Sequence, residues 1–397
     1  MSKLQELIKE LCPEGVEFRK LGEVCEYIRG ITYNKSQEAK PNDINTIKVL
    51  RANNISVSTN TLNFSDIKEV ISTVKYKKEQ KLYKGDILIC AGSGSKEHIG
   101  KVAYIFNDID YTFGGFMAVV RCSPNITSRF LFHILTSKSF NDYLNKTIDS
   151  STINNLNSRI MGNFEIPLPP LEIQNEIVRI LDAFTAHTAE LQAELQARKE
   201  QYEYYRNKLF TFDENDEGVK WMKLNEFAEI GTGSSNTQDE LSDGLYPFFV
   251  RSQIVRSKNE YEFDETAIIT SGDGVGVGKI FHYVEGKYAL HQRAYRIHIL
   301  DNTVMPKFFF YYMRSEFYNY ITKNAFSSSV TSIRKPMLLN FPVPLPPLSE
   351  QQRIVSILDK FESLVNDLSE GLPAEIAAVQ EQYEYYRNKL LTFKRKS

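Results

Sequence analysis

The sequence predicts an α+β protein in which two similar domains are joined by two long antiparallel helices. Three observations support this fold: an internal repeat, strand-like and helix-like segments that recur in both copies, and a long amphipathic segment that closes each copy. The expected order is a variable domain at 1–165, a helix at 166–212, a second variable domain at 213–342 and a second helix at 343–397.

The internal repeat is the strongest signal in the chain. The segment NFEIPLPPLEIQNEIVRILDAF at 163–184 and the segment NFPVPLPPLSEQQRIVSILDKF at 340–361 are identical at 14 of 22 positions, with an offset of 177. The segment EQYEYYRNKL at 200–209 recurs unchanged at 381–390. We infer that the chain contains two copies of one unit, each a diverged domain followed by a constant segment.

Each variable domain combines strand and helix patterns. The stretches GDILICAGSG at 85–94 and TAIITSGDGVGVGKIFHYV at 266–284 are rich in β-formers and end in glycine turns. The stretches SRFLFHILTSKSFNDYLNK at 128–146 and MPKFFFYYMRSEFYNYITK at 305–323 look helical, and at an offset of 177 Phe132 aligns with Phe309. Segments 151–162 and 329–339 begin with Ser or Thr, which predicts N-caps there.

The constant segments read as long helices. Each starts after a PLPP motif, at 167–170 and 344–347, because prolines are not tolerated inside a helix. Apolar residues then recur at three- and four-residue steps, which indicates a coiled-coil-like seam. Gly371 and Pro373 predict a kink or break in the second helix. The chain must return after the first helix, so the pair is expected to be antiparallel, with a pseudo-twofold arrangement.

Composition excludes several classes of protein. The four cysteines form no CxxC pair and the six histidines are scattered, so we predict no metal site, no disulfide framework and no cofactor. The N-terminus lacks the apolar core of a signal peptide, and no apolar run has the length of a membrane span. We therefore expect a cytoplasmic protein with no membrane partner.

Motifs that imitate enzymes are incomplete. The stretch SGDGVGVGKI at 271–280 lacks the first glycine and the final Ser or Thr of a phosphate-binding loop. Asp273 followed by Glu285–Gly286–Lys287 has the outline of a nuclease site, but the first copy has no counterpart. No tetrapeptide of the kind that holds a flipped adenine is present. We predict no catalytic residues.

The chain resembles the specificity subunits of type I restriction–modification enzymes. The resemblance rests on CPEGVEFRKLGEV at 12–24, IPLPPLEIQNEIV at 166–178, VPLPPLSEQQRIV at 343–355 and the twin QYEYYRNKL, and it covers nearly the whole chain. It implies a non-catalytic subunit whose two domains each read one half of a split, asymmetric site in double-stranded DNA. It also implies that the helices dock two methyltransferase subunits and that restriction subunits complete the enzyme. Two alternatives are an autonomous DNA-modifying enzyme and a coiled-coil adaptor that does not bind DNA.

Candidate DNA contacts follow from the chemistry of base reading. Arg and Lys suit guanine, Asn and Gln suit adenine, hydroxyls adapt to either, and helix N-termini can hold phosphate. In the first domain the candidates are Asn34, Lys35, Arg51, Asn53, Asn54, Ser93, Ser95, Lys96, Lys101, Ser150, Ser151 and Thr152. In the second they are Arg251, Ser252, Gln253, Lys279, His291, Gln292, Arg293, Ser328, Ser329 and Thr331.

The twin YEYYR segments predict a partner surface. Tyr202, Tyr205, Tyr383 and Tyr386 fit the apolar seam and are expected in the core. The residues expected to point outward, and therefore to bind the same partner twice, are Tyr204, Arg206, Tyr385 and Arg387. The alternative is a recent duplication, but the variable domains have diverged almost completely.

Overall fold

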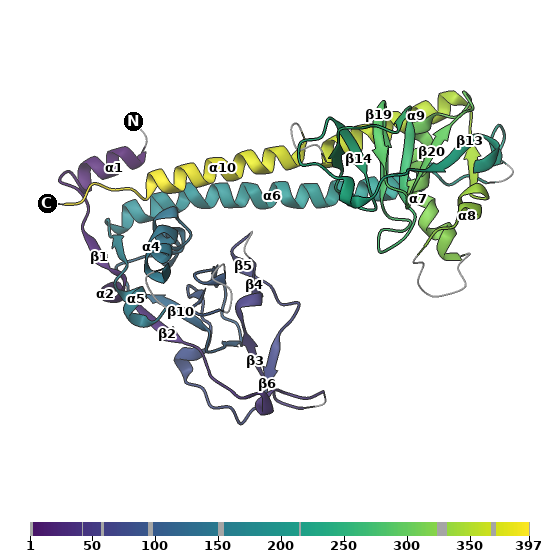
Figure 1. Ribbon diagram of the computed structural model, residues 1–397. Helices are drawn as coiled ribbons and strands as arrows, with labels where there is room; N and C mark the ends of the chain where they lie inside the picture. Colours follow the sequence, from purple (N-terminus) through teal and green to yellow (C-terminus); the bar gives the residue numbers. More distant parts are fainter. Residues whose placement is uncertain are drawn as a thin grey trace. The chain divides into compact units, whose positions relative to one another are not determined.

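The computed structural model describes residues 3–41, 43–56, 59–93, 98–149, 155–213, 216–323, 332–366 and 371–396. It is a mixed α and β structure with two compact units, as the sequence predicts (Figure 1). Unit 1 comprises Met1–Glu190 and Ile376–Ser397, and unit 2 comprises Leu191–Glu375. Among the described residues no helix is long and apolar enough to cross a membrane.

Unit 1 is built around two small sheets with strand orders β2-β10-β7-β8 and β6-β3-β9. Strand β3 pairs antiparallel with β6 and parallel with β9. The elements of the variable part are α1 (Lys3–Leu11), β1 (Phe18–Lys20), α2 (Leu21–Val24), β2 (Cys25–Arg29), η1 (Lys35–Gln37), β3 (Ile47–Leu50), η2 (Ala52–Asn54), β4 (Ile55–Ser56), β5 (Thr61–Leu62), β6 (Lys68–Val70), η3 (Lys78–Gln80), β7 (Ile87–Cys90), β8 (Val102–Tyr104), β9 (Thr112–Phe113), β10 (Met117–Cys122), α3 (Ser128–Leu135), α4 (Lys138–Asp149), α5 (Ser158–Gly162) and β11 (Glu165–Pro167).

Strand β7 shows why this sheet forms the centre of the domain. Its residues alternate between two apolar clusters: Ile87 and Ile89 face one, and Leu88 and Cys90 face the other. All four are fully buried. An unbroken apolar run therefore makes a strand covered on both faces, which explains the pattern read from the sequence.

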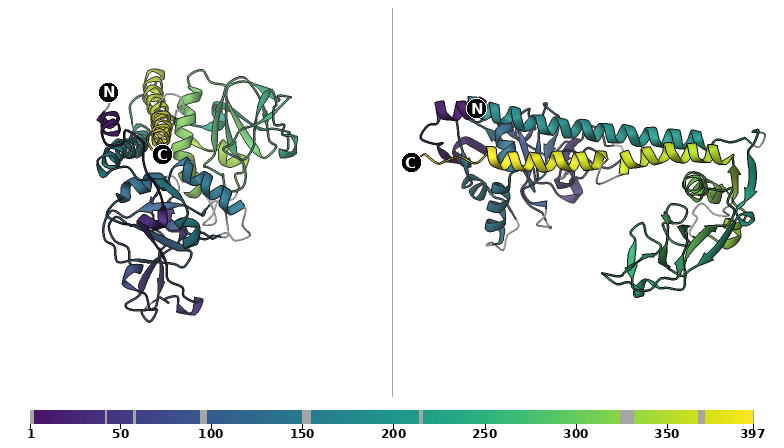
Figure 2. Two further views of the ribbon diagram at one scale, coloured as in Figure 1. Left: turned by 90° about the vertical axis from the view of Figure 1, so that its left-hand side faces the viewer. Right: turned by 90° about the horizontal axis from the view of Figure 1, so that it is seen from above.

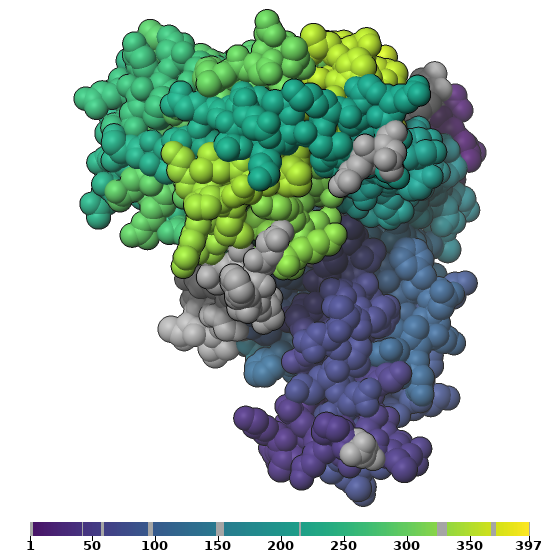
Figure 3. Space-filling model, turned by 90° about the vertical axis from the view of Figure 1, so that its right-hand side faces the viewer, coloured from purple at the N-terminus to yellow at the C-terminus, as the bar shows by residue number. Residues whose placement is uncertain are grey.

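Unit 2 repeats the same plan. Its sheets have orders β13-β20-β17-β18 and β15-β14-β19-β16, and β14 pairs parallel with β19 as β3 does with β9. Strands β12 and β21 pair antiparallel. Figure 3 shows a face of unit 2 on which teal and yellow-green parts of the chain lie side by side. The elements are β12 (Lys220–Lys223), η5 (Leu224–Glu226), β13 (Ala228–Thr232), η6 (Thr237–Asp239), β14 (Tyr246–Phe249), β15 (Arg256–Lys258), β16 (Phe263–Asp264), β17 (Ala267–Ser271), β18 (Phe281–Val284), β19 (Lys287–Leu290), β20 (Ala294–Ile299), α7 (Pro306–Lys323), α8 (Lys335–Leu339) and β21 (Pro342–Leu345).

Between the helix that follows the sheet and the constant helix, unit 1 is one residue longer than unit 2. Asp182 and Asp359 correspond at an offset of 177, yet they bond to His133 and Tyr311, which are 178 residues apart. Unit 1 has one extra residue, and its helix is interrupted between α3 and α4, whereas α7 is continuous. The aromatic ring equivalent to Phe132 is therefore Phe310, which contacts Tyr283 as Phe132 contacts Tyr104, and not Phe309 as the alignment suggested.

The constant helices begin where the PLPP motifs predict. They are α6 (Leu171–Leu209), α9 (Leu348–Asn366) and α10 (Leu372–Leu390). The expected break in the second helix is confirmed, since α9 ends before Gly371 and Pro373 lies in the first turn of α10. In unit 1, Phe184 of α6 contacts Tyr386 of α10; in unit 2, Phe361 of α9 contacts Tyr205 of α6. The ribbons of α6 and α10 in unit 1, and of α6 and α9 in unit 2, lie side by side (Figure 2). Equivalent phenylalanines and tyrosines of the two copies therefore form the same kind of pair in both units, as expected of a pseudo-twofold repeat.

A buried glutamine fixes the start of each constant helix. Gln174 accepts a hydrogen bond from the amide of Thr127 (2.8 Å), and Gln351 accepts one from the amide of Met305 (2.8 Å). Each also donates to a carbonyl of its own PLPP motif, at 2.8 Å in both units. Both side chains are fully buried, so these bonds tie the helix to the variable domain without competition from water.

The Ser and Thr residues predicted as N-caps at the start of segments 151–162 and 329–339 lie outside the described residues. The short helices α5 and α8 begin later, at Ser158 and Lys335. Asn157 caps α5 by accepting a hydrogen bond from the amide of Ile160, and Arg334 precedes α8 without a side-chain cap.

Backbone pairing joins the two chain segments that form unit 1, because the amide of Val16 donates to the carbonyl of Lys394 (2.8 Å).

Candidate nucleic-acid interface and partner surface

Three loops of unit 1 meet at one place: the loop after β3, the loop after β7 and the turn between β9 and β10. The amide of Gly114 donates to the carbonyl of Leu50, and the amide of Gly92 donates to the carbonyl of Phe116, each at 2.9 Å. These loops line a cavity of about 950 Å³. Four predicted DNA contacts line it together, namely Arg51, Asn53, Ser93 and Lys101.

An aspartate organises the arginine and amide of this cavity. Asp66 accepts hydrogen bonds from Nη2 of Arg51 and from Nδ2 of Asn53, both at 2.8 Å. The neighbouring Asn54, also predicted to face DNA, is instead buried, and its amide donates to the carbonyls of Asn63 and Asp66 at 2.9 Å. Its hydrogen-bonding groups are used within the loop, so we correct its role to positioning.

The remaining candidates of unit 1 are dispersed. Asn34 and Lys35 are exposed at η1 and do not line the cavity. The ammonium of Lys101 contacts Nδ1 of His98. Outside the described residues lie Ser95, Lys96, Ser150, Ser151, Thr152, Ser328, Ser329 and Thr331.

Unit 2 brings the same three loops together around another aspartate. Nη1 of Arg251 lies 2.5 Å from Oδ1 of Asp273, and Nη1 of Arg293 lies 3.4 Å from Oδ2. The amide of Gly272 donates to the carbonyl of Arg293 (2.9 Å), which repeats the bond from the amide of Ala91 to the carbonyl of Phe116 (2.8 Å) in unit 1. Two guanidinium groups are therefore held at one surface position.

The other candidates of unit 2 differ in burial. His291, predicted to face DNA, is buried, and its Nδ1 accepts a hydrogen bond from the amide of Arg293 (3.0 Å). Burial, followed by the nearby cations Arg251 and Arg293, lowers the pKa of His291, so the imidazole is neutral and shapes the turn. We correct its role accordingly. Of the others, Ser252 is half-buried, and the exposed ones are Gln253, Lys279 and Gln292.

Sequence reasoning missed four residues of these sites. Asp66 and Asp273 orient the arginines, but a carboxylate in a loop gives no such signal before the fold is known. Phe116 and Val275 are apolar yet 72% and 101% exposed. The sequence did contain a signal for Phe116. The segment YTFGGFMA at 111–118 aligns with YALHQRAY at 288–295, so that Phe116 corresponds to Arg293, a candidate DNA contact. Within the described residues no group of His, Cys, Asp or Glu forms a metal site.

The exposed tyrosines of the constant helices are as predicted. Tyr204 and Tyr385 are 62% and 59% exposed. Tyr205 and Tyr386, expected in the core, are also about 40% exposed, and each stacks on one phenylalanine across the helix pair. That expectation is wrong, because these contacts cover each ring only in part.

The two arginines of the twin segments do not project freely, which corrects their predicted orientation. The guanidinium of Arg206 lies 5.6 Å from the ring centroid of Tyr202, and that of Arg387 lies 4.9 Å from that of Tyr383. Arg387 is buried, and the Nε of each arginine is buried without a hydrogen-bond partner. Cation–π contact with the tyrosine below holds each side chain against its helix.

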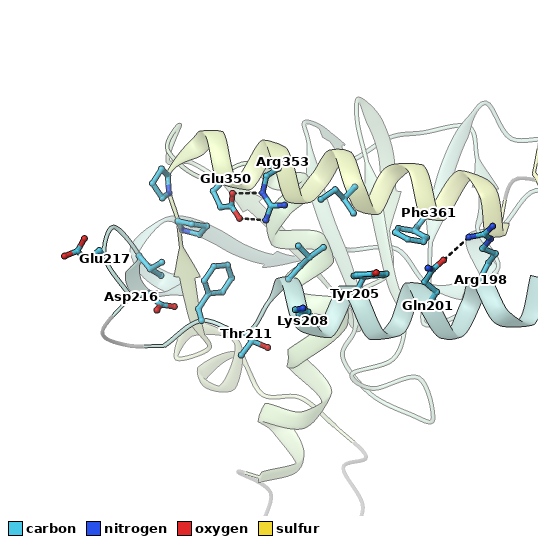
Figure 4. A pocket seen from close by; sticks show the side chains of 16 residues that line it. Arg198, Gln201, Tyr205, Lys208, Thr211, Asp216, Glu217, Glu350, Arg353 and Phe361 are labelled. Atoms are coloured by element: carbon cyan, nitrogen blue, oxygen red, sulfur yellow. Dashed lines mark hydrogen bonds and ion pairs between the residues drawn. The ribbon is translucent and has the colours of Figure 1, made fainter.

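A groove lies beside this surface in unit 2. It has a volume of about 940 Å³ and runs between the end of α6 and the start of α9 (Figure 4). Tyr205 and Phe361 line one end, and the ion pair of Glu350 with Arg353 (2.7 Å) lies along α9. The residue of unit 1 equivalent to Arg353 is Glu176, which is only 4% exposed because Lys3 of α1 covers it with an ion pair (3.0 Å).

A buried histidine joins three helices of unit 1. Nε2 of His133 donates to Asp182 of α6 (2.9 Å), and Nδ1 accepts from the hydroxyl of Tyr383 of α10 (3.0 Å). Burial lowers the pKa of His133, and the hydrogen bond to Asp182 opposes this only in part. The imidazole is therefore neutral at pH 7, with the tautomer that its two partners require.

Comparison with known proteins identifies the family. The model of the type I restriction modification DNA specificity domain matches residues 13–201 and 216–378. The chain belongs to this family. A putative specificity subunit of Haemophilus influenzae is 30% identical over 345 residues, which cover 78% of this chain and 84% of that one. The EcoR124I/EcoR124II specificity subunit of Escherichia coli is 35% identical over 257 residues, 58% of this chain and 63% of its own length.

Solved structures show the same fold for this specificity subunit. A chain from a structure of type I R-M complex assembly and conformational transition has a TM-score of 0.64 at 19% identity, with 96% of this chain and 98% of that chain covered. The S subunit from M. genitalium has a TM-score of 0.55 at 15% identity, with 95% and 96% covered. A specificity subunit contributes DNA recognition and no catalysis, in agreement with the incomplete enzyme motifs.

Proposed function

We propose that the specificity subunit reads a bipartite site in double-stranded DNA, one half through residues 1–165 and the other through 213–342. The observation that supports this is the three-loop arrangement, which both units build from the same backbone bonds but equip with different side chains. One scaffold with two sets of donors suits the recognition of two unlike half-sites.

We further propose that segments 166–212 and 343–397 space the half-sites and dock two methyltransferase subunits. Tyr204 and Tyr385 support this role, because equivalent exposed tyrosines on two helices offer one partner the same surface twice. Restriction subunits then complete the enzyme, and the assembly acts in the cytoplasm, where it meets DNA.

Domain exchange tests the reading of half-sites. Residues 1–165 are replaced by the matching domain of a relative, the subunit is assembled with its methyltransferase, and methylated sites are mapped by sequencing. We expect one half-site to change and the other to persist. If both half-sites change together, the two domains do not read DNA independently and the proposal fails.

A further inference from the structure

We propose that Phe116 is a base-reading residue of the first domain and that it contacts the 5-methyl group of a thymine. This inference rests on the proposed DNA recognition. Phe116 is 72% exposed and lines the cavity that also holds Arg51, Asn53 and Lys101. An apolar ring amid three polar side chains is not explained by packing, because most of its surface contacts nothing in the part of the chain that the structure describes.

The backbone around Phe116 is fixed although its side chain is free. Its carbonyl accepts hydrogen bonds from the amides of Ala91 (2.8 Å) and Gly92 (2.9 Å). Nη2 of Arg29 donates to the carbonyl of Gly115 (2.7 Å), and a Cβ at Gly115 would lie 2.9 Å from Cγ2 of Thr32. The ring is thus presented on a rigid turn, which keeps the entropy cost of binding low.

The residue equivalent to Phe116 in the second domain indicates the role of this position. Arg293 occupies the equivalent place, since its carbonyl accepts the hydrogen bond from Gly272 as that of Phe116 accepts the hydrogen bond from Ala91. An exposed arginine there has the chemistry to read guanine. Thymine carries the one apolar group that a base pair presents in the major groove, and a phenylalanine complements it. The same position therefore reads different bases in the two half-sites.

Uracil substitution tests this contact directly. The complex of full-length subunit and methyltransferase is assayed by fluorescence anisotropy on its mapped site, with each thymine of the first half-site replaced in turn by deoxyuridine. For the native protein we expect one position at which loss of the methyl group weakens binding about fourfold, the effect of exposing roughly one methyl group. Phe116→Ala should bind the thymine site as weakly as the native protein binds the uracil site. Its affinity should not change further when uracil replaces thymine at that position.

Two controls keep the outcomes apart. Ile44, an 85% exposed apolar residue outside the cavity, gives the control Ile44→Ala, which should retain the uracil effect. Phe116→Leu, which keeps an apolar group, should retain part of the uracil effect.

A first half-site without thymine, or a uracil effect in Phe116→Ala equal to that of the native protein, overturns the inference while DNA recognition stands. If Phe116→Ala lowers affinity and DNA bending whatever the base, Phe116 is a wedge and the thymine assignment is wrong. Absence of sequence-specific binding by the native complex would instead refute the proposed function.

Discussion

At the scale of single residues, Asp273 holds two side chains that we propose read DNA in the second domain. It pairs with Arg251 and Arg293, so that two guanidinium groups with the chemistry to read guanine share one carboxylate. Asp273→Asn removes this constraint and makes the surface more positive. We expect affinity for non-specific DNA to rise and the ratio of specific to non-specific affinity to fall, on the order of tenfold.

The measurement is fluorescence anisotropy of the assembled complex at one fixed salt concentration, because phosphate contacts depend on salt. Asp243→Asn removes the same charge from an exposed site in the same domain and serves as the control. Equal ratios for both variants would show that charge alone matters and that Asp273 does not orient the arginines.

His133 makes the stability of unit 1 depend on pH. Its pKa is lowered in the folded protein, so the unfolded chain binds the proton more readily. The free energy of unfolding should therefore be highest above about pH 6.5 and fall on acidification below it, by at most about 1.4 kcal/mol per pH unit.

Urea denaturation of the full chain between pH 5 and 8 measures this dependence. His133→Gln should remove part of the slope, because glutamine carries no titrating proton. His187, an exposed histidine of α6, provides the control His187→Gln, which should leave the slope unchanged. An unaltered slope in His133→Gln would assign the acid sensitivity to other groups.

At the scale of elements, we propose that α6 sets the distance between the two half-sites. It is unbroken from Leu171 to Leu209 and contains the tandem units TAEL at 188–191 and QAEL at 192–195. Insertion of one TAEL after Leu195 adds about 6 Å of helix, and four residues exceed one turn only slightly. Because one base-pair step is about 3.4 Å, we expect the gap between half-sites to grow by one to two base pairs.

Methylome sequencing of a host that carries the insertion reads this gap. Gln192→Thr, which creates a second TAEL without changing the length, is the matched control and should keep the native gap. An active enzyme whose insertion variant also keeps the native gap would show that α6 does not set the spacing.

The elements also show where sequence reasoning works. Proline and glycine act through local backbone geometry, so PLPP located the start of α6 and α9, and Gly371 with Pro373 located the break before α10. Burial depends on contacts between distant segments. Asn54 and His291 therefore looked like DNA contacts although both are buried, and the exposed Phe116 was missed.

At the scale of the whole molecule, two equivalent tyrosines predict the stoichiometry of assembly. Tyr204→Ala with Tyr385→Ala should reduce the number of methyltransferase subunits bound, because each removes an exposed ring from one docking surface. Arg206 and Arg387 are left intact, since both pack on tyrosines of their own helices. Native mass spectrometry counts the subunits.

The double variant should fold normally, and its circular dichroism spectrum should match the native one. Tyr261→Ala, at an exposed tyrosine of the second variable domain, is the control for loss of one aromatic ring. Two methyltransferase subunits on the double variant would place the docking surface elsewhere on the chain.

The pairing of Val16 with Lys394 has a consequence for synthesis on the ribosome. Unit 2 is one continuous stretch of chain, whereas Tyr383, Leu390 and Phe393, which follow unit 2 in the sequence, pack against the core of unit 1. The first domain therefore cannot complete its core until unit 2 and the segment after it have been synthesised, although the first domain emerges earlier. The usual N-to-C order of domain folding is reversed, and the nascent first domain waits with an unfilled apolar face that a chaperone can cover.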